Sequence, residues 1–183
     1  KRGALVCQKS YTTQYWNVNL SCAKEWVGAA PDDVEAKIVL LEGIEARKYY
    51  EDNSELRKSI LEGALKTNPN DPDINYHQAK YLLSQNDSST EATPYFIKAV
   101  EAKPENQQWR QELIAFLQRT NDKKKQLKYL LLDVQENPKD IKKLEDLAIW
   151  YETFQEWNNA IETRQKIIEL EANIVEKERR QKL

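Results

Sequence analysis

Four prolines recur along the chain at nearly constant intervals. Pro31, Pro69, Pro104 and Pro138 follow one another after 38, 35 and 34 residues, and each comes after a stretch with helical apolar spacing. Proline lacks the N–H that a helix interior needs, so each is expected to lie where one helix ends and the next begins. Asp or Asn follows each proline closely and can cap the next helix. The sequence therefore predicts repeated pairs of helices.

The composition favours helices and argues against most kinds of catalytic site. Of 183 residues, 40% are hydrophobic, 32% are charged and only 4 are Gly, a balance that favours helix over sheet. His77 is the single histidine, and no glycine-rich phosphate-binding motif occurs. We therefore expect no enzyme activity, no cofactor and no metal site. A general-base role for His77 in an unseen pocket is a minor alternative to a surface or groove histidine.

The repeating units resemble the tetratricopeptide repeat family. That family places bulky and small residues at fixed positions of two helices and often closes the unit with proline. The unit 139–172 carries the pattern most clearly, with Leu144, Leu147, Ala148 and Tyr151 in its first helix. The unit 105–138 departs from it at Gln126 and Asp133, where the family prefers Ala.

The resemblance implies an all-α fold, a right-handed superhelical solenoid of stacked antiparallel helix hairpins with a C-terminal capping helix. Neighbouring hairpins must stack because one hairpin cannot bury both of its faces. We predict one continuous array of six segments. These are a partial or degenerate N-terminal hairpin (1–31), four repeats (32–69, 70–104, 105–138 and 139–172) and the capping helix (173–183).

Several large apolar residues are assigned to packing by their place in the repeat. Trp109 is expected to pack in the first helix of its unit, and Trp157 at the bend of the last unit. The residues that open and close the second helix of that unit are Ala160, Ile161, Ile167, Ile168 and Leu170. Trp16 and Trp26 fall in the degenerate first unit, where a core position and an exposed partner surface are both possible.

The fold implies a non-enzymatic protein–protein interaction module, a scaffold or adaptor that binds a partner peptide or helix along a repeat groove. A fixed structural subunit or segment of a larger multiprotein assembly is the alternative. An RNA-binding helical repeat is less favoured because the net charge is −2 and no basic stripe occurs. We expect a protein partner, with no nucleic acid and no membrane span, and the sequence does not give the oligomeric state.

In the family, the inner positions of successive first helices line the concave face. Carried over to this chain, those positions hold more acidic than basic residues, and Glu42 and Glu45 lie on the equivalent face of an earlier unit. We therefore expect a partner segment with some basic residues, with Tyr76 as the main anchor. Binding through the convex side or the first unit is the alternative. The predicted groove residues are Tyr76, His77, Lys80, Gln108, Gln111, Glu112, Arg119, Lys142, Glu145, Asp146, Ile149 and Glu152.

The two cysteines leave the compartment open. Cys7 and Cys22 are the only ones, and no C-x-x-C motif occurs. Free thiols that pack as small apolar residues are the favoured interpretation, and this predicts a cytoplasmic protein. A Cys7–Cys22 disulfide would instead indicate a secreted or periplasmic one.

Overall fold

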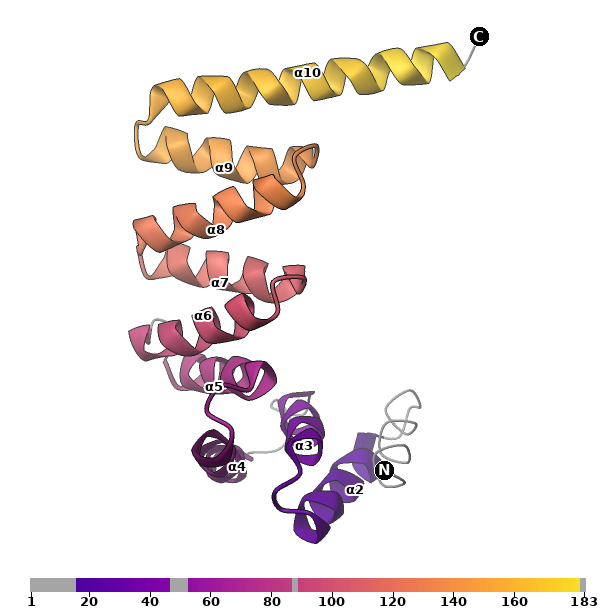
Figure 1. Ribbon diagram of the computed structural model, residues 1–183, viewed down its shortest axis with the longest axis vertical. Coiled ribbons are helices and arrows are strands. Elements are labelled where there is room, and N and C mark those ends of the chain that lie inside the picture. Colours follow the sequence, from indigo (N-terminus) through magenta and orange to yellow (C-terminus); the bar gives the residue numbers. More distant parts are fainter. Residues whose placement is uncertain (1–15, 47–52, 87–88, 182–183) are drawn as a thin grey trace. The chain divides into compact units, whose positions relative to one another are not determined.

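The structure, a computed structural model, describes residues 16–46, 53–86 and 89–181, and no strand occurs among them. The all-α prediction is confirmed. The described elements, in chain order (Figure 1), are α2 (Trp16–Ala29), α3 (Val34–Ala46), α4 (Ser54–Thr67), α5 (Pro72–Gln85), the short 3-10 helix η1 (Thr90–Ala92), α6 (Thr93–Ala102), α7 (Gln107–Arg119), α8 (Lys123–Glu136), α9 (Ile141–Thr153) and α10 (Trp157–Gln181).

The chain divides into two compact units, residues 1–113 and 114–183, with the division inside α7. In the first unit, α2 packs on α3, α3 on both α4 and α5, α4 on α5, and α5 on α6. In the second unit, α8 packs on α9 and α9 on α10. Within each unit, helices that follow one another in the sequence thus bury each other's apolar faces, as helix hairpins do.

The four periodic prolines build the same turn each time. The residue two positions after each proline donates its N–H to the carbonyl of the residue before that proline, at 3.0 to 3.2 Å. Its side-chain oxygen then accepts the N–H three residues later, which caps the next helix. The four capping residues are Asp33, Asp71, Asn106 and Asp140, at 3.2, 3.0, 3.1 and 3.3 Å. The predicted helix starts follow directly from this local chemistry.

The turns inside the two C-terminal helix pairs are also alike. Asn121 follows α7 and Gln155 follows α9, and among the described residues these are the non-glycine ones with positive φ, at 55° and 62°. The next residue in each turn donates its N–H back to the helix, Asp122 to Leu117 and Glu156 to Tyr151. This pattern satisfies carbonyls that the helix end leaves without partners, and it recurs after one repeat length.

Small residues occupy fully buried positions on several helices. Ala64, Ala79, Ala99 and Ala148 have no exposed surface, and Ala160 has almost none. Because an alanine side chain takes little room, two helix backbones can come close at these points. Larger side chains such as Leu113 and Leu144 fill the space that remains.

The C-terminus differs from the predicted arrangement. A separate capping helix at 173–183 was expected, but α10 continues without a break from Trp157 to Gln181. Ala172 stands where the earlier repeats have proline, and alanine favours helix continuation over a turn. Among the described helices, none has both the length and the low charge that a bilayer-spanning segment requires.

Part of the predicted first hairpin lies outside the described residues. Cys7 is in this part. Cys22 is disulfide-bonded, so the favoured expectation of free thiols is wrong for Cys22, and the predicted pairing with Cys7 lies outside the described residues. Cys22 and Trp26 lie on α2 and are partly buried against the core of the first unit. Trp26 therefore contributes to packing.

Candidate functional site

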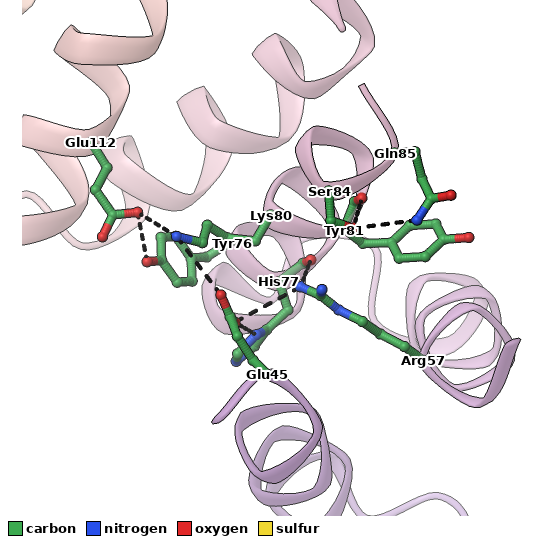
Figure 2. A network of polar contacts seen from close by, with 9 residues as sticks. All are labelled: Glu45, Arg57, Tyr76, His77, Lys80, Tyr81, Ser84, Gln85 and Glu112. Atoms are coloured by element: carbon green, nitrogen blue, oxygen red, sulfur yellow. Dashed lines mark hydrogen bonds and ion pairs between the residues drawn. The ribbon is translucent and has the colours of Figure 1, made fainter. Parts of the chain in front are cut away.

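In the first unit, ion pairs join side chains of α3, α5 and the start of α7. Lys80 Nζ on α5 lies 3.7 Å from Glu45 Oε1 on α3 and 3.1 Å from Glu112 Oε2 on α7. Figure 2 shows Lys80 between the two carboxylates. We call Glu45, Arg57, Tyr76, His77, Lys80 and Glu112 the α5 network. Its members lie on four helices, α3, α4, α5 and α7, and its basic groups lie beside its carboxylates, so its charges largely satisfy one another.

Glu45 lies at the centre of the buried part of this network. Its carboxylate is 3.8 Å from Arg57 Nη2 and 3.5 Å from His77 Nδ1, and Arg57 also donates to the His77 carbonyl at 3.4 Å. Burial by itself would raise the pKa of Glu45. The contacts with His77, Arg57 and Lys80 outweigh burial and lower that pKa to about 2. At 3.5 Å the imidazole is at the limit of hydrogen-bond distance from the Glu45 carboxylate.

Tyr76 is held on both its ring face and its hydroxyl. The ring stacks on Trp109, with centroids 4.4 Å apart and planes at 10°. The hydroxyl donates to Glu112 Oε2 at 2.9 Å. Burial, followed by the nearby negative charge of Glu112, raises the pKa of the phenol. Tyr76 is only 9% exposed, so its ring already serves as a core residue and the expectation that it is the main anchor does not fit this structure.

The other predicted groove residues of the first unit divide between the core and the surface. His77 is buried at the Glu45 contact. Gln108 is exposed and donates to Glu112 Oε1 at 3.2 Å. Gln111 is exposed on α7. The structure therefore brings Tyr76, His77, Lys80 and Glu112 together, but mainly as partners of one another.

The second unit presents a different surface on α9. Lys142, Glu145 and Ile149 are exposed, and Asp146 is half-buried. Ile149 is 52% exposed, a large value for an isoleucine on a packed helix. Burial raises the pKa of Asp146, while nearby Lys142 opposes this shift. We call Lys142, Glu145, Asp146 and Ile149 the α9 face: a solvent-facing apolar side chain beside two carboxyl groups.

Two further predicted residues of this unit lie away from the centre of the α9 face. Glu152, at the end of α9, receives two hydrogen bonds from the guanidinium of Arg164 on α10, at 2.9 and 3.1 Å. Arg119, at the end of α7, is exposed. A forked contact of this kind fixes the Glu152 carboxylate in one orientation, so Glu152 is less available to a partner than Glu145.

The two departures from the repeat pattern turn out to be buried polar contacts. Gln126 Oε1 accepts a hydrogen bond from the Trp150 indole N–H at 3.1 Å. Asp133 is almost fully buried, 3.6 Å from Lys143 Nζ. Both contacts join α8 to α9. The sequence marked Gln126 and Asp133 as unusual, but their partners become visible only when the helices pack.

A related contact involves residues that the sequence did not single out. Asn75 and Arg110 each lie six residues after a periodic proline, and each donates to the carbonyl of that proline at 3.0 Å. Buried backbone carbonyls need partners, so these side chains stabilise the turn between repeats. The sequence did contain a signal for this contact. Two units carry a polar residue at the position where the last unit has Leu144.

The tryptophan assignments are partly corrected. Trp109 is buried, as expected, and so is Trp150. Trp157 was expected to pack at the bend of the last unit, but it is 57% exposed. Ile161 and Ile168, assigned to packing in the same helix, are exposed as well. They lie on a side of α10 that α9 does not cover, whereas Ala160 and Ile167 are buried.

No protein-family model and no curated protein matches the sequence. Solved structures, by contrast, are similar over nearly the whole chain. A structure of MamA protein has a TM-score of 0.72 at 12% identity and covers 95% of this chain and 94% of its own. MamA from Desulfovibrio magneticus RS-1 has a TM-score of 0.69 at 19% identity, covering 93% and 94%.

A third similar structure is YrrB, described as a TPR protein with an unusual peptide-binding site. Its TM-score is 0.68 at 14% identity, and the match covers 99% of this chain and 91% of YrrB. At these sequence identities, the structural similarity is evidence for the fold alone. The paired helices, the recurring proline turns and these neighbours lead to one conclusion: the chain has the tetratricopeptide repeat fold.

Proposed function

We propose that this chain is a non-enzymatic protein–protein interaction module that binds a peptide or helical segment of a partner protein through the α9 face. The observation that carries the proposal is the exposed Ile149 beside Glu145 and the half-buried Asp146. An apolar contact with charge beside it gives both affinity and specificity. YrrB, which shares the fold, is described with a peptide-binding site.

The chemistry of the α9 face favours a partner segment with a basic residue next to an apolar one. Burial raises the pKa of Asp146 because the ionised form lacks full solvation. A lysine or arginine placed against Asp146 would offset that cost, and Glu145 lies on the same side of the helix one position earlier. In the first unit, Glu45 and Glu112 are already paired with Lys80, so the partner's cation is expected at α9.

The proposal is tested by selecting binders from a displayed library of random peptides and measuring their affinities by fluorescence anisotropy. We expect enrichment of peptides that carry Lys or Arg next to an apolar residue. The double change Glu145→Lys and Asp146→Lys should weaken binding by about tenfold or more, and Ile149→Ser should weaken it by roughly the same factor. Raising the salt concentration should weaken binding as well.

The matched control is Glu62→Lys with Glu105→Lys, which makes the same change in charge at two exposed positions of the other unit. It should leave the affinities within about twofold of wild type, because both sites are solvated and distant charges are screened. Equal affinity of the α9 variant and wild type would contradict the proposal. So would a selection that yields no binder, or binders without basic residues.

A further inference from the structure

The last helix carries a stripe of large apolar side chains that no described residue covers. Trp157, Ile161 and Ile168 are 57%, 55% and 63% exposed. Their spacing of four and seven residues places them on one side of α10. Ala160 and Ile167, on the side that packs against α9, are buried. We call Trp157, Ile161 and Ile168 the α10 stripe.

The preceding repeat indicates what kind of structure fits such a stripe. Ile161 and Ile168 correspond to Leu127 and Val134 of α8, one repeat earlier by the interval between Pro104 and Pro138. Leu127 and Val134 are half-buried, and the following helix, α9, packs on α8. The second helix of a repeat therefore receives another helix, and α10 offers the same positions with larger exposure.

The charges beside the α10 stripe indicate the chemistry of that helix. Glu162 and Glu169, seven residues apart, run along one side of the stripe, and both are exposed. On the other side, Arg164 is already held by Glu152 at 2.9 Å. The contact between α8 and α9 provides a parallel, because Asp133 on the second helix faces Lys143 on the helix that follows.

We propose that the α10 stripe is a docking site for one amphipathic helix of a partner protein, with an apolar face that covers Trp157, Ile161 and Ile168 and with Lys or Arg along the edge that faces Glu162 and Glu169. This site is separate from the α9 face and uses different side chains. Packing of helix on helix supplies the affinity, and the acidic edge selects the partner and its orientation.

The test uses two synthetic helical peptides of about 18 residues, long enough to span the stripe and stapled to hold the helix. Both have apolar residues at helical spacing; one has Lys along one edge and the other has Glu. Each is titrated into the full chain by fluorescence anisotropy. We expect the Lys peptide to bind wild type about tenfold or more tightly than the Glu peptide.

Four variants locate the binding. Ile168→Asp should abolish it, whereas Leu131→Asp, the same kind of change at a 43% exposed residue of α8, should not. Glu162→Lys with Glu169→Lys should remove or reverse the preference for the Lys peptide. Measured in the background of Glu145→Lys with Asp146→Lys, which disables the α9 face, the loss of Lys-peptide binding caused by Ile168→Asp should persist, which separates this proposal from the proposed function.

Other outcomes would overturn the proposal. Equal binding of the two peptides to wild type, or normal binding to Ile168→Asp, would show that the stripe does not select a basic helix. Sedimentation of the protein alone provides a second measurement. If wild type self-associates at micromolar concentration and Ile168→Asp does not, the stripe is covered by a second copy of this chain instead.

Discussion

The first helices of two repeats, α5 and α9, place different residues at the same positions, and the results differ. Counted from the preceding proline, Tyr76, His77 and Lys80 of α5 correspond to Glu145, Asp146 and Ile149 of α9. In α5, the aromatic ring stacks on Trp109 and the cation pairs with Glu45 and Glu112. In α9, Ile149 stands at the position of Lys80, and its side chain is exposed to solvent.

The comparison shows that a repeat position does not fix a role. The helical spacing places each of these side chains on one face of its helix. The neighbouring helices then determine whether the side chain makes contacts inside the protein or stays exposed. Trp109 and Glu112 supply those contacts to α5. The α5 network therefore serves stability, and the α9 face is the better candidate for binding.

The largest expected effect is a charge placed in the core of the second unit. Leu147 is buried on α9, so Leu147→Asp should lower the free energy of unfolding by about 4 kcal/mol through an unpaired buried carboxylate. Hydrogen exchange should show loss of protection in residues 114–183 first. The control is Leu131→Asp at an exposed site. Equal stability of the two variants would mean that our phase for α9 is wrong.

A smaller effect is expected from overpacking the first unit. Ala99 on α6 has no exposed surface, and Ala99→Trp should cost about 1–3 kcal/mol because the helices cannot separate freely. Protection from exchange should fall mainly within residues 1–113. Ala102→Trp, at an exposed position of the same helix, should be nearly neutral by thermal unfolding. A stable Ala99→Trp protein would show that α6 does not approach its neighbours closely there.

The comparison itself is tested by two matched truncations. Glu45→Ala leaves the buried Arg57 and His77 without their carboxylate and should cost about 1–3 kcal/mol. Glu145→Ala removes an exposed carboxylate and should change stability by less than about 0.5 kcal/mol. Urea unfolding of both variants measures the difference. If both variants lose the same free energy of unfolding, the α5 network does not differ from the α9 face in its contribution to stability.

A further expected effect is a difference in the response to acid. The pKa of Glu45 is about 2 in the folded chain, below its ordinary value of 4.5, so the unfolded state takes up the proton first. The stability that Glu45 provides is complete above pH 4.5 and is lost as the pH falls from there towards 2. Glu45→Gln should therefore reduce the loss of stability over this range.

The pKa shift of Asp146 has the opposite sign from that of Glu45. Burial raises its pKa above 3.8 in the folded chain, so the folded state takes up the proton first and stability rises as the pH falls through that window. Asp146→Asn should slightly stabilise the chain at neutral pH. Urea unfolding between about pH 3 and pH 7 checks both variants. Parallel pH profiles for Glu45→Gln and wild type would contradict the proposed role of Glu45.

The sequence predicted the local features of the fold well. Helix pairs, helix starts after Pro31, Pro69, Pro104 and Pro138, and close packing at alanines depend on interactions within a few residues or on residue size, so a single sequence contains them. The predicted groove stays a prediction, but the structure gives one of its residues a different role. Tyr76 was chosen as an anchor because its side chain offers contact area, but that area is taken by Trp109, which lies in another helix.

The sequence by itself determined where each helix begins, because proline removes an N–H and the Asp or Asn two residues later accepts one. It also determined that the helices come in pairs, through the repeated apolar spacing. Only the tertiary structure decided which polar residues pair with one another and which remain exposed. Contacts such as Glu45 with Lys80 and Gln126 with Trp150 join residues 35 and 24 positions apart. Burial of Tyr76 and exposure of Ile149 and Trp157 depend on which helix lies beside each of them, and residue type at a repeat position does not specify that.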